Sequence, residues 1–259
     1  MKIGLSTGSL QKLRETEESF ALLKELGAET CGVDLQTFYE YRPEFAKKYA
    51  ERLAGVEVHS VGVAPDNFEP QLFSSSRRIR GDGFYWLDQI LRSAQILGVK
   101  NYSFRGSFNA VENLNYDGLA ERMREIVDFC AHYGVKVCLE NTLHGLYNKP
   151  AIFKELKNRG ADILGVFNIG QALKSGNPYN IYIKDMEGCI SHVHILDVDK
   201  NGNACLPGRG ICDFKEVFKN LRGAGFDGAV LIKTSEFDDI SEIKKSIEFL
   251  KETIYKTLA

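Results

Sequence analysis

Polar and charged residues recur at one kind of position in the sequence, directly after a short apolar run. These residues are Asp34, His59, Arg105, Glu140, Asn168, His194 and Lys233, and just beyond the same runs lie Asn141, Gln171, Asp197 and Arg209. Carboxylates, imidazoles and amines are the groups that proteins use to transfer protons. Arginine adds a two-pronged donor for a phosphate or a carboxylate. The set therefore predicts a polar site for a small, oxygen-rich molecule.

Glu140 is the strongest candidate in this set. It ends the apolar run Val-Cys-Leu, where an unpaired charge is too costly to bury, so the carboxylate needs a partner. Asp34 and His59 have a structural alternative, because the local backbone can satisfy them. Arg105 could form a packing salt bridge with Asp34 or Glu140, and Asn141 could cap or brace a loop.

A junction that repeats along the chain indicates which elements position these residues. A helical pattern ends in glycine and an apolar run begins at once, at Gly27, Gly55, Gly98, Gly134, Gly160, Gly188 and Gly225. Glycine suits the left-handed conformation that ends a helix. Apolar runs rich in β-branched residues are typical of buried parallel strands. The repeat therefore predicts consecutive βα units.

Eight strands are expected from these runs. They are Ile3–Ser6, Thr30–Leu35, Val56–Val61, Asn101–Phe104, Lys136–Glu140, Ile163–Phe167, Ile190–Leu196 and Ala229–Lys233. With amphipathic helices between them, eight strands predict an α/β fold, a single (β/α)8 TIM barrel domain over residues 1–259. Strand ends in such a barrel meet in one pocket. Three non-periodic stretches are expected as loops, namely Ala64–Gly83, Leu143–Lys149 and Asp197–Cys212.

Composition narrows the possible partners. The formal net charge of −2 does not favour broad nucleic-acid binding. No apolar run reaches the length of about 18 residues that a membrane span needs, and the first residues turn polar too early for a signal peptide. None of the six cysteines forms a C-x-x-C pair, so we expect reduced thiols in a cytoplasmic protein.

Four segments resemble the xylose-isomerase-like TIM-barrel superfamily, which contains sugar and sugar-phosphate isomerases and epimerases, and endonuclease IV. They are Val137–Thr142, similar to the fifth-strand LEN segment; Gly165–Ala172, similar to the sixth-strand D-x-G-H segment; His192–Asp197, similar to the seventh-strand H-x-x-D segment; and Pro207–Phe214, similar to the P-G-x-G-x-x-D-F turn. The resemblance spans nearly the whole chain. It points to the superfamily and to no single activity.

The resemblance implies a metal site that this sequence has partly lost. Such enzymes hold a divalent metal with Glu, Asp, His and Glu on strands five to eight, and the two Glu residues exchange protons with the sugar while the metal stabilises the enediolate. Glu140 and His194 match this pattern. Asn168 and Gln171 replace the strand-six Asp and its His partner, and Lys233 replaces the strand-eight Glu.

These replacements leave one anionic ligand of three, so we expect no metal and no other cofactor. The ammonium of Lys233 would then take the place of the metal, in an ion pair with Glu140. The position of Lys233 is inferred from its spacing to Gly228. The nearest carboxylate in this region is Glu236, three residues further on.

The first functional hypothesis is a metal-independent isomerase or epimerase of a sugar or sugar phosphate. Glu140 would act as the base, Lys233 would stabilise the enediolate and His194 would shuttle a proton. Arg105 and Arg209 could receive a phosphate or carboxylate. The full set of expected substrate-binding residues is Arg105, Asn168, Gln171, His59 and Arg209.

The alternative hypothesis is a non-catalytic sugar-binding or regulatory protein on the same scaffold. Schiff-base chemistry at Lys233 is disfavoured, because a nearby Glu140 keeps the amine charged. Endonuclease activity is also disfavoured, since its multinuclear metal site needs many His and acidic residues and the chain has five His. The identity of the sugar, its phosphorylation and the oligomeric state are left open.

Overall fold

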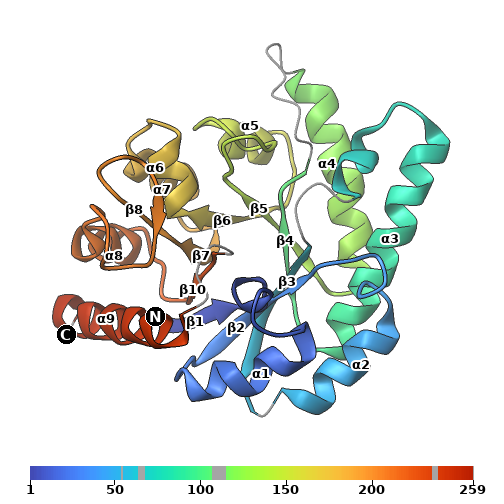
Figure 1. Ribbon diagram of the computed structural model, residues 1–259. Coiled ribbons are helices and arrows are strands. Elements are labelled where there is room, and N and C mark those ends of the chain that lie inside the picture. The colour runs from blue at the N-terminus through green and yellow to red at the C-terminus, as the bar shows by residue number, and fades with distance from the viewer. Residues whose placement is uncertain (54, 64–67, 107–114, 235–238, 259) are drawn as a thin grey trace.

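Eight parallel strands close into a barrel in the computed structural model, which describes residues 1–53, 55–63, 68–106, 115–234 and 239–258 (Figure 1). Around the barrel the order is β1-β10-β7-β6-β5-β4-β3-β2. The strands are β1 Lys2–Ser6, β2 Thr30–Leu35, β3 Glu57–Val63, β4 Asn101–Phe104, β5 Lys136–Glu140, β6 Leu164–Asn168, β7 Ile190–Ile195 and β10 Ala229–Ile232. The predicted (β/α)8 barrel is confirmed. Glu236 lies outside the described residues.

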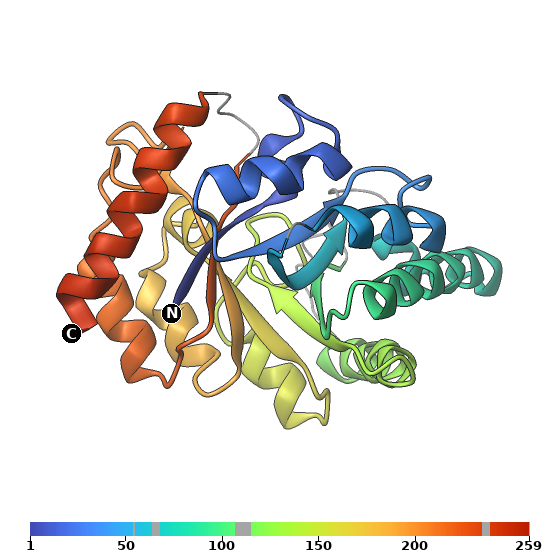
Figure 2. The ribbon, with the colours of Figure 1, turned by 90° about the horizontal axis from the view of Figure 1, so that it is seen from below.

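Helices surround the strands on all sides (Figures 1 and 2). The α-helices are α1 Thr16–Glu25, α2 Pro43–Arg52, α3 Arg77–Ile96, α4 Tyr116–Ala131, α5 Ile152–Asn158, α6 Ile169–Lys174, α7 Tyr179–Asp185, α8 Phe214–Gly223 and α9 Ile240–Leu258, and the short 3-10 helices are η1 Thr7–Leu10 and η2 Glu69–Phe73. Within the described residues, no helix combines the length and the apolar character that crossing a membrane requires.

Two of the predicted loops contain regular structure. The stretch Ala64–Gly83 was expected as a loop, but η2 lies within it and α3 already begins at Arg77. In the stretch Asp197–Cys212, the short strands β8 (Asp197–Val198) and β9 (Ala204–Cys205) pair as an antiparallel hairpin. Neither stretch shows an apolar period, because each buries only isolated apolar side chains, such as Phe68, Leu72 and Leu206, rather than a regular stripe.

The predicted glycine junctions all have the left-handed backbone that ends a helix. At Gly27, Gly55, Gly98, Gly134, Gly160, Gly188 and Gly225 the φ angle is positive, between 70° and 85°. Only glycine adopts this conformation without a steric penalty from Cβ. The seven residues therefore set where each helix stops and the chain turns back into the barrel.

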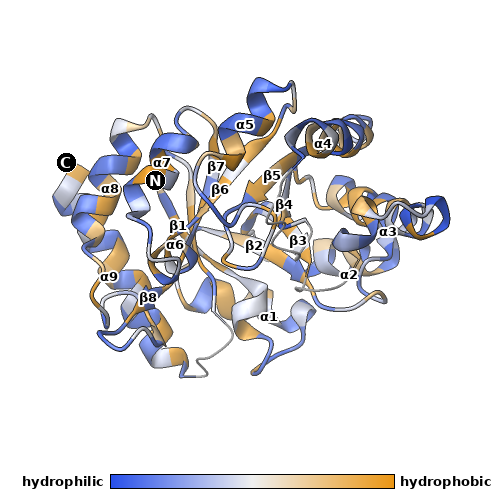
Figure 3. Cartoon of the chain, turned by 90° about the horizontal axis from the view of Figure 1, so that it is seen from above, coloured by the Kyte–Doolittle hydropathy of each residue, from blue (hydrophilic) through white to orange (hydrophobic). Residues whose placement is uncertain are grey.

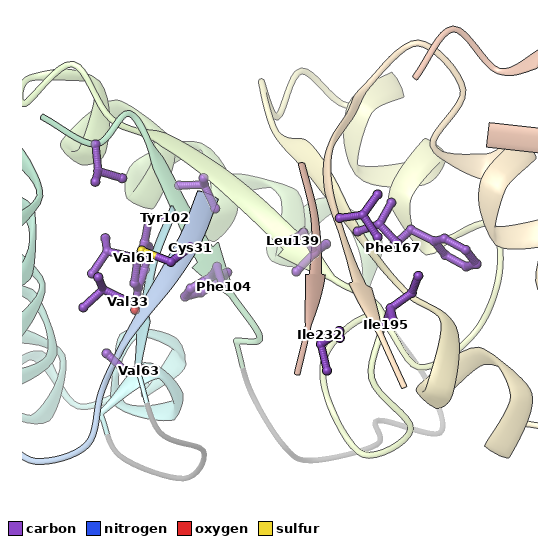
Figure 4. Packing of buried hydrophobic residues seen from close by; sticks show 14 of the residues in the cluster. Cys31, Val33, Val61, Val63, Tyr102, Phe104, Leu139, Phe167, Ile195 and Ile232 are labelled. Atoms are coloured by element: carbon purple, nitrogen blue, oxygen red, sulfur yellow. The ribbon is translucent and has the colours of Figure 1, made fainter. Parts of the chain in front are cut away.

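Alternation along the strands divides the core from the polar interior. Val33, Leu139, Phe167, Ile195 and Ile232 point outward and are buried beneath the helices, in two groups that Figure 4 shows on opposite sides of the barrel. Hydrophobic colour dominates the strands, and the hydrophilic colour lies mainly on the outer helices (Figure 3). Because successive side chains in a strand face opposite ways, the polar neighbour of each outward residue must point into the barrel.

Candidate functional site

Five ionisable side chains converge at the carboxyl ends of the barrel strands. Asp34, Glu140 and His194 belong to β2, β5 and β7, and Arg105 and Lys233 directly follow β4 and β10. The strands are parallel, so their carboxyl ends share one face of the barrel. The first three residues are buried, and the side chains of Arg105 and Lys233 are only 15% and 16% exposed.

Three donors surround the carboxylate of Glu140. Its Oε1 accepts hydrogen bonds from Nδ1 of His194 and Nδ2 of Asn168, both at 2.7 Å, and its Oε2 accepts from Nε of Arg105 at 3.1 Å. Burial alone would raise the pKa of Glu140, but His194, Arg105 and Lys233 hold it well below its ordinary range. Glu140 is therefore ionised, and its engaged oxygens make it a weak proton acceptor.

Lys233 forms its ion pair with Asp34, and the predicted pair with Glu140 is wrong. Nζ of Lys233 lies 3.0 Å from Oδ1 of Asp34, while the Ser6 hydroxyl donates to Oδ2. Burial opposes ionisation of Asp34, but Lys233 and the Ser6 hydrogen bond lower its pKa. The barrel order explains the choice, because only β1, which ends in the small Ser6, separates β2 from β10, whereas β7 and β6 separate β10 from Glu140.

His194 presents a neutral imidazole. Burial lowers its pKa, and the nearby Lys233 adds to this effect against the opposing charge of Glu140. Because ionised Glu140 can only accept, the proton of the neutral ring sits on Nδ1. The lone pair of Nε2 is then available, and no hydrogen bond to it comes from any residue in the described ranges. A carboxylate-oriented imidazole of this kind suits proton abstraction.

Asn168 and its neighbours brace the site. While Nδ2 of Asn168 faces Glu140, its Oδ1 accepts from the backbone N–H of Gln171 at 3.0 Å and caps α6. The side chain of Gln171 accepts from the N–H of Leu143 at 2.9 Å. Asn141 exchanges two hydrogen bonds with the backbone of Asn168, at 2.7 and 3.0 Å. Gln171 and Asn141 thus hold loops in place, as the structural alternative for Asn141 anticipated.

Two expected site residues do not join the cluster. His59 lies near the start of β3, where its ring packs at 5.2 Å against the ring of His192. The side chain of Arg209 is 55% exposed and pairs with Glu242 of α9 on the outside of the barrel. Arg209 is drawn outward because the loop that carries it is anchored elsewhere.

That anchor is Asp197, whose buried carboxylate organises the loop after β7. It accepts backbone N–H groups from Val198 at 2.9 Å, Gly208 at 3.2 Å, Gly210 at 3.0 Å and Cys212 at 3.1 Å. The geometry explains the second glycine of the P-G-x-G segment, because a Cβ on Gly210 would lie 2.3 Å from Oδ1 of Asp197. Asp197 therefore serves the fold of this loop.

Sequence reasoning missed Glu69, a buried carboxylate in η2. It accepts from the hydroxyl of Tyr102 at 2.6 Å and from the backbone N–H groups of Arg105 at 2.9 Å and Gly106 at 2.8 Å. Burial outweighs these donors and raises its pKa. Glu69 fixes the backbone from which Arg105 reaches Glu140. The only sequence signal was an acidic residue beside Phe68 in an otherwise non-periodic stretch.

Three of the five histidines form a column of edge-to-face ring contacts that runs on from His194 of this cluster. The ring of His192 lies 5.0 Å from that of His194 and 5.2 Å from that of His59. Its Nε2 contacts Oγ of Ser103 at 2.9 Å, and its Nδ1 contacts Oγ of Ser191 at 3.1 Å. Burial, followed by the neighbouring imidazoles, holds the pKa of His192 well below its ordinary value. The column is therefore uncharged at neutral pH.

Comparison with known proteins identifies relatives of this chain. The family described as Xylose isomerase-like TIM barrel matches residues 20–253. An uncharacterized protein of Methanocaldococcus jannaschii is 31% identical over 138 residues, which are 50% of this chain and 46% of that protein. An inosose dehydratase of Yersinia enterocolitica is 25% identical over 161 residues, 52% of this chain and 54% of the enzyme. The chain thus matches about half the length of these relatives.

Among solved structures, L-ribulose 3-epimerase has a similar fold. It superimposes with a TM-score of 0.80 at 16% identity, covering 99% of this chain and 95% of that one. At this level of identity the likeness concerns the fold alone.

Glu69 provides the first test of this geometry. In the variant Glu69→Gln, one of the three donors that converge on the carboxylate loses its acceptor or meets an N–H group. We expect the free energy of unfolding to fall by about 1–3 kcal/mol in urea denaturation. Glu248→Gln, on the exposed face of α9, is the control and should change it by less than about 0.5 kcal/mol. Equal effects of the two substitutions would show that Glu69 holds nothing in place.

The histidine column predicts acid sensitivity. Unfolded histidine takes up a proton below about pH 6.5, whereas folded His192 does not until the pH is much lower. Stability should therefore decline as the pH falls from about 6.5 to 5, with a slope of about 1.4 kcal/mol per pH unit for each such histidine. Urea denaturation of wild-type protein and of His192→Gln should show a shallower slope in the variant. His132→Gln controls for loss of a surface histidine, and a flat wild-type profile would contradict the assignment.

Proposed function

Because the chain belongs to the xylose isomerase-like TIM barrel family, we propose that it isomerises or epimerises a sugar by proton transfer at a carbon next to the carbonyl group. The observation that carries the proposal is the dyad of His194 and Glu140 at the mouth of the barrel, within the field of Lys233. The inosose dehydratase and the L-ribulose epimerase among its relatives and structural neighbours act on polyhydroxy carbonyl compounds by name.

His194 is the proposed base. Its Nε2 lone pair takes the proton from the carbon, the electrons of the broken C–H bond form a C=C bond, and the carbonyl oxygen becomes the enediolate oxygen. Glu140 holds the ring and stabilises the imidazolium that forms, in place of the base role expected from the sequence. Return of the proton from His194 to the adjacent carbon, with transfer of the hydroxyl proton to the enediolate oxygen, completes an isomerisation. In an epimerisation a water molecule on the opposite face donates a proton to the same carbon, and His194 releases its own proton to solvent.

Lys233 is the proposed stabiliser of the enediolate. An ammonium has three N–H donors, and in the described parts of the chain one of them meets an acceptor, Asp34. The other two can point to an oxygen that gains charge in the transition state. Preorganised positive charge in a site with little water is the most effective form of such stabilisation.

We propose that this reaction proceeds without a divalent metal. The donors at the family's metal-binding positions do not fit one: Glu140 already accepts three hydrogen bonds, the Asn168 oxygen caps α6, and the Lys233 ammonium has no lone pair. Lys233 and Arg105 also bring the positive charge that a metal would supply.

A second candidate is a non-catalytic sugar-binding protein. The closed Lys233–Asp34 ion pair and the saturated Glu140 favour it, because an internally satisfied cluster is stable without doing chemistry. The two candidates differ in one respect, which is whether Nε2 of His194 exchanges a proton with the ligand.

Exchange of a carbon-bound proton tests the proposal. L-ribulose or an inosose is incubated in ²H₂O with wild-type protein that has been treated with EDTA. We expect the substrate to incorporate deuterium at the carbon next to its carbonyl group, as measured by ¹H NMR. His194→Gln should slow incorporation by about 10²–10⁴-fold and Lys233→Met by about 10²–10³-fold. Arg209→Gln, which lies outside the site, is the control and should exchange at the wild-type rate.

Two other outcomes of the exchange experiment would favour a binding protein or a metal-dependent enzyme. Binding of either sugar without exchange would favour the binding protein. Exchange that EDTA abolishes and Mn²⁺ restores would contradict the metal-independent mechanism while leaving the enzyme in place.

A further inference from the structure

Charges at the mouth of the barrel cancel in pairs. Arg105 pairs with Glu140 at 3.1 Å and Lys233 pairs with Asp34 at 3.0 Å, while His194 is neutral. The five groups therefore sum to zero. A phosphate ester carries nearly two negative charges at neutral pH, and here it would meet two carboxylates whose counter-ions are already committed.

The remaining arginine expected to receive an anion is directed away. Arg209 pairs with Glu242, which also accepts from Lys245 at 2.7 Å on the exposed side of α9. A guanidinium group can bind a phosphate through two parallel hydrogen bonds. That of Arg209 is instead engaged by Glu242 on the outer surface.

The backbone donors after β7 are also occupied. Many TIM barrels bind phosphate with the loops after strands seven and eight, where free N–H groups face the anion. In this chain the buried carboxylate of Asp197 takes the N–H groups of Gly208, Gly210 and Cys212. These N–H groups are thus engaged by the protein's own carboxylate and are not available to a phosphate.

After β10, an exposed aspartate also engages backbone donors. Asp239 accepts the N–H groups of Ser241 at 2.8 Å and Glu242 at 3.3 Å at the start of α9.

The composition of three further sequence segments points the same way. Segments 64–67, 107–114 and 235–238, which follow β3, β4 and β10, contain four acidic residues and no Lys, Arg or His. These segments therefore contain no cationic side chain.

From these observations we infer that the site takes an uncharged, unphosphorylated polyhydroxy carbonyl compound and rejects its phosphate ester. The inference rests on the proposed function only in taking the ligand to be a sugar. A neutral ligand keeps both ion pairs intact and offers hydroxyl groups to the two Lys233 donors that meet no acceptor among the described residues. A phosphate ester would have to break an ion pair or displace the carboxylate of Asp197.

Histidine NMR tests the inference on the wild-type protein. With five histidines, ¹³Cε1-labelled protein gives a signal for His194 that the His194→Gln variant assigns. Titration at pH 7.5 uses L-ribulose, L-ribulose 5-phosphate and inorganic phosphate. We expect L-ribulose to shift the His194 signal, the phosphate ester to bind at least about ten-fold more weakly, and inorganic phosphate to cause no saturable shift.

The variant Asp34→Asn tests whether the balance of charge in the site is what excludes phosphate. Asp34→Asn leaves Lys233 without its counter-ion and gives the site a net positive charge, so inorganic phosphate should now shift the His194 signal. Saturable binding of inorganic phosphate to wild-type protein, or binding of the ester as tight as that of L-ribulose, would overturn the inference. If no neutral sugar tested shifts the signal while phosphate also fails to, the exclusion of anions stands and the proposed function is the part that fails.

Discussion

The structure of the site depends on one constraint, that the carboxylate of Glu140 is buried at the centre of the barrel mouth and must be compensated there. An unpaired ion in such surroundings costs several kcal/mol. The compensation comes from Arg105, which directly follows β4, and from Asn168 and His194 of β6 and β7. Two of these residues are in turn held through their backbone N–H groups, Arg105 by Glu69 and Asn168 by Asn141. The remaining loops arrange themselves around these contacts.

Much of the fold followed from two local rules. Apolar runs and glycine at helix ends predicted eight strands, and the carboxyl ends of these strands gave the candidates Glu140, Asn168 and His194. The sequence did not determine which charged side chains form ion pairs with one another. Whether Lys233 meets Glu140 or Asp34 depends on the order of strands around the closed barrel, in which β1 alone separates β10 from β2. The predicted (β/α)8 barrel already implies that order, but it leaves open which of two carboxylates on the same face of the barrel a long Lys side chain reaches.

Long loops limited the prediction for a related reason. Glu69 and Asp197 lie in stretches without an apolar period, and each works by accepting backbone N–H groups, which every residue type provides. Arg209 was expected in the site because it belongs to a motif there, but the Asp197 contacts turn its loop outward. Such buried carboxylates replace the hydrophobic stripe as the organiser of irregular chain, and they also remove donors that an anionic ligand would need.

Asp34 and Lys233 form a coupled pair that neutralises the site from within. A double-mutant cycle with Asp34→Asn and Lys233→Met, measured by urea denaturation, tests it most directly. We predict a coupling energy of about 1–3 kcal/mol, larger than that between Glu140→Gln and Lys233→Met in the same experiment. Additive losses for Asp34 and Lys233 would contradict the account, because the ammonium would then balance a different charge.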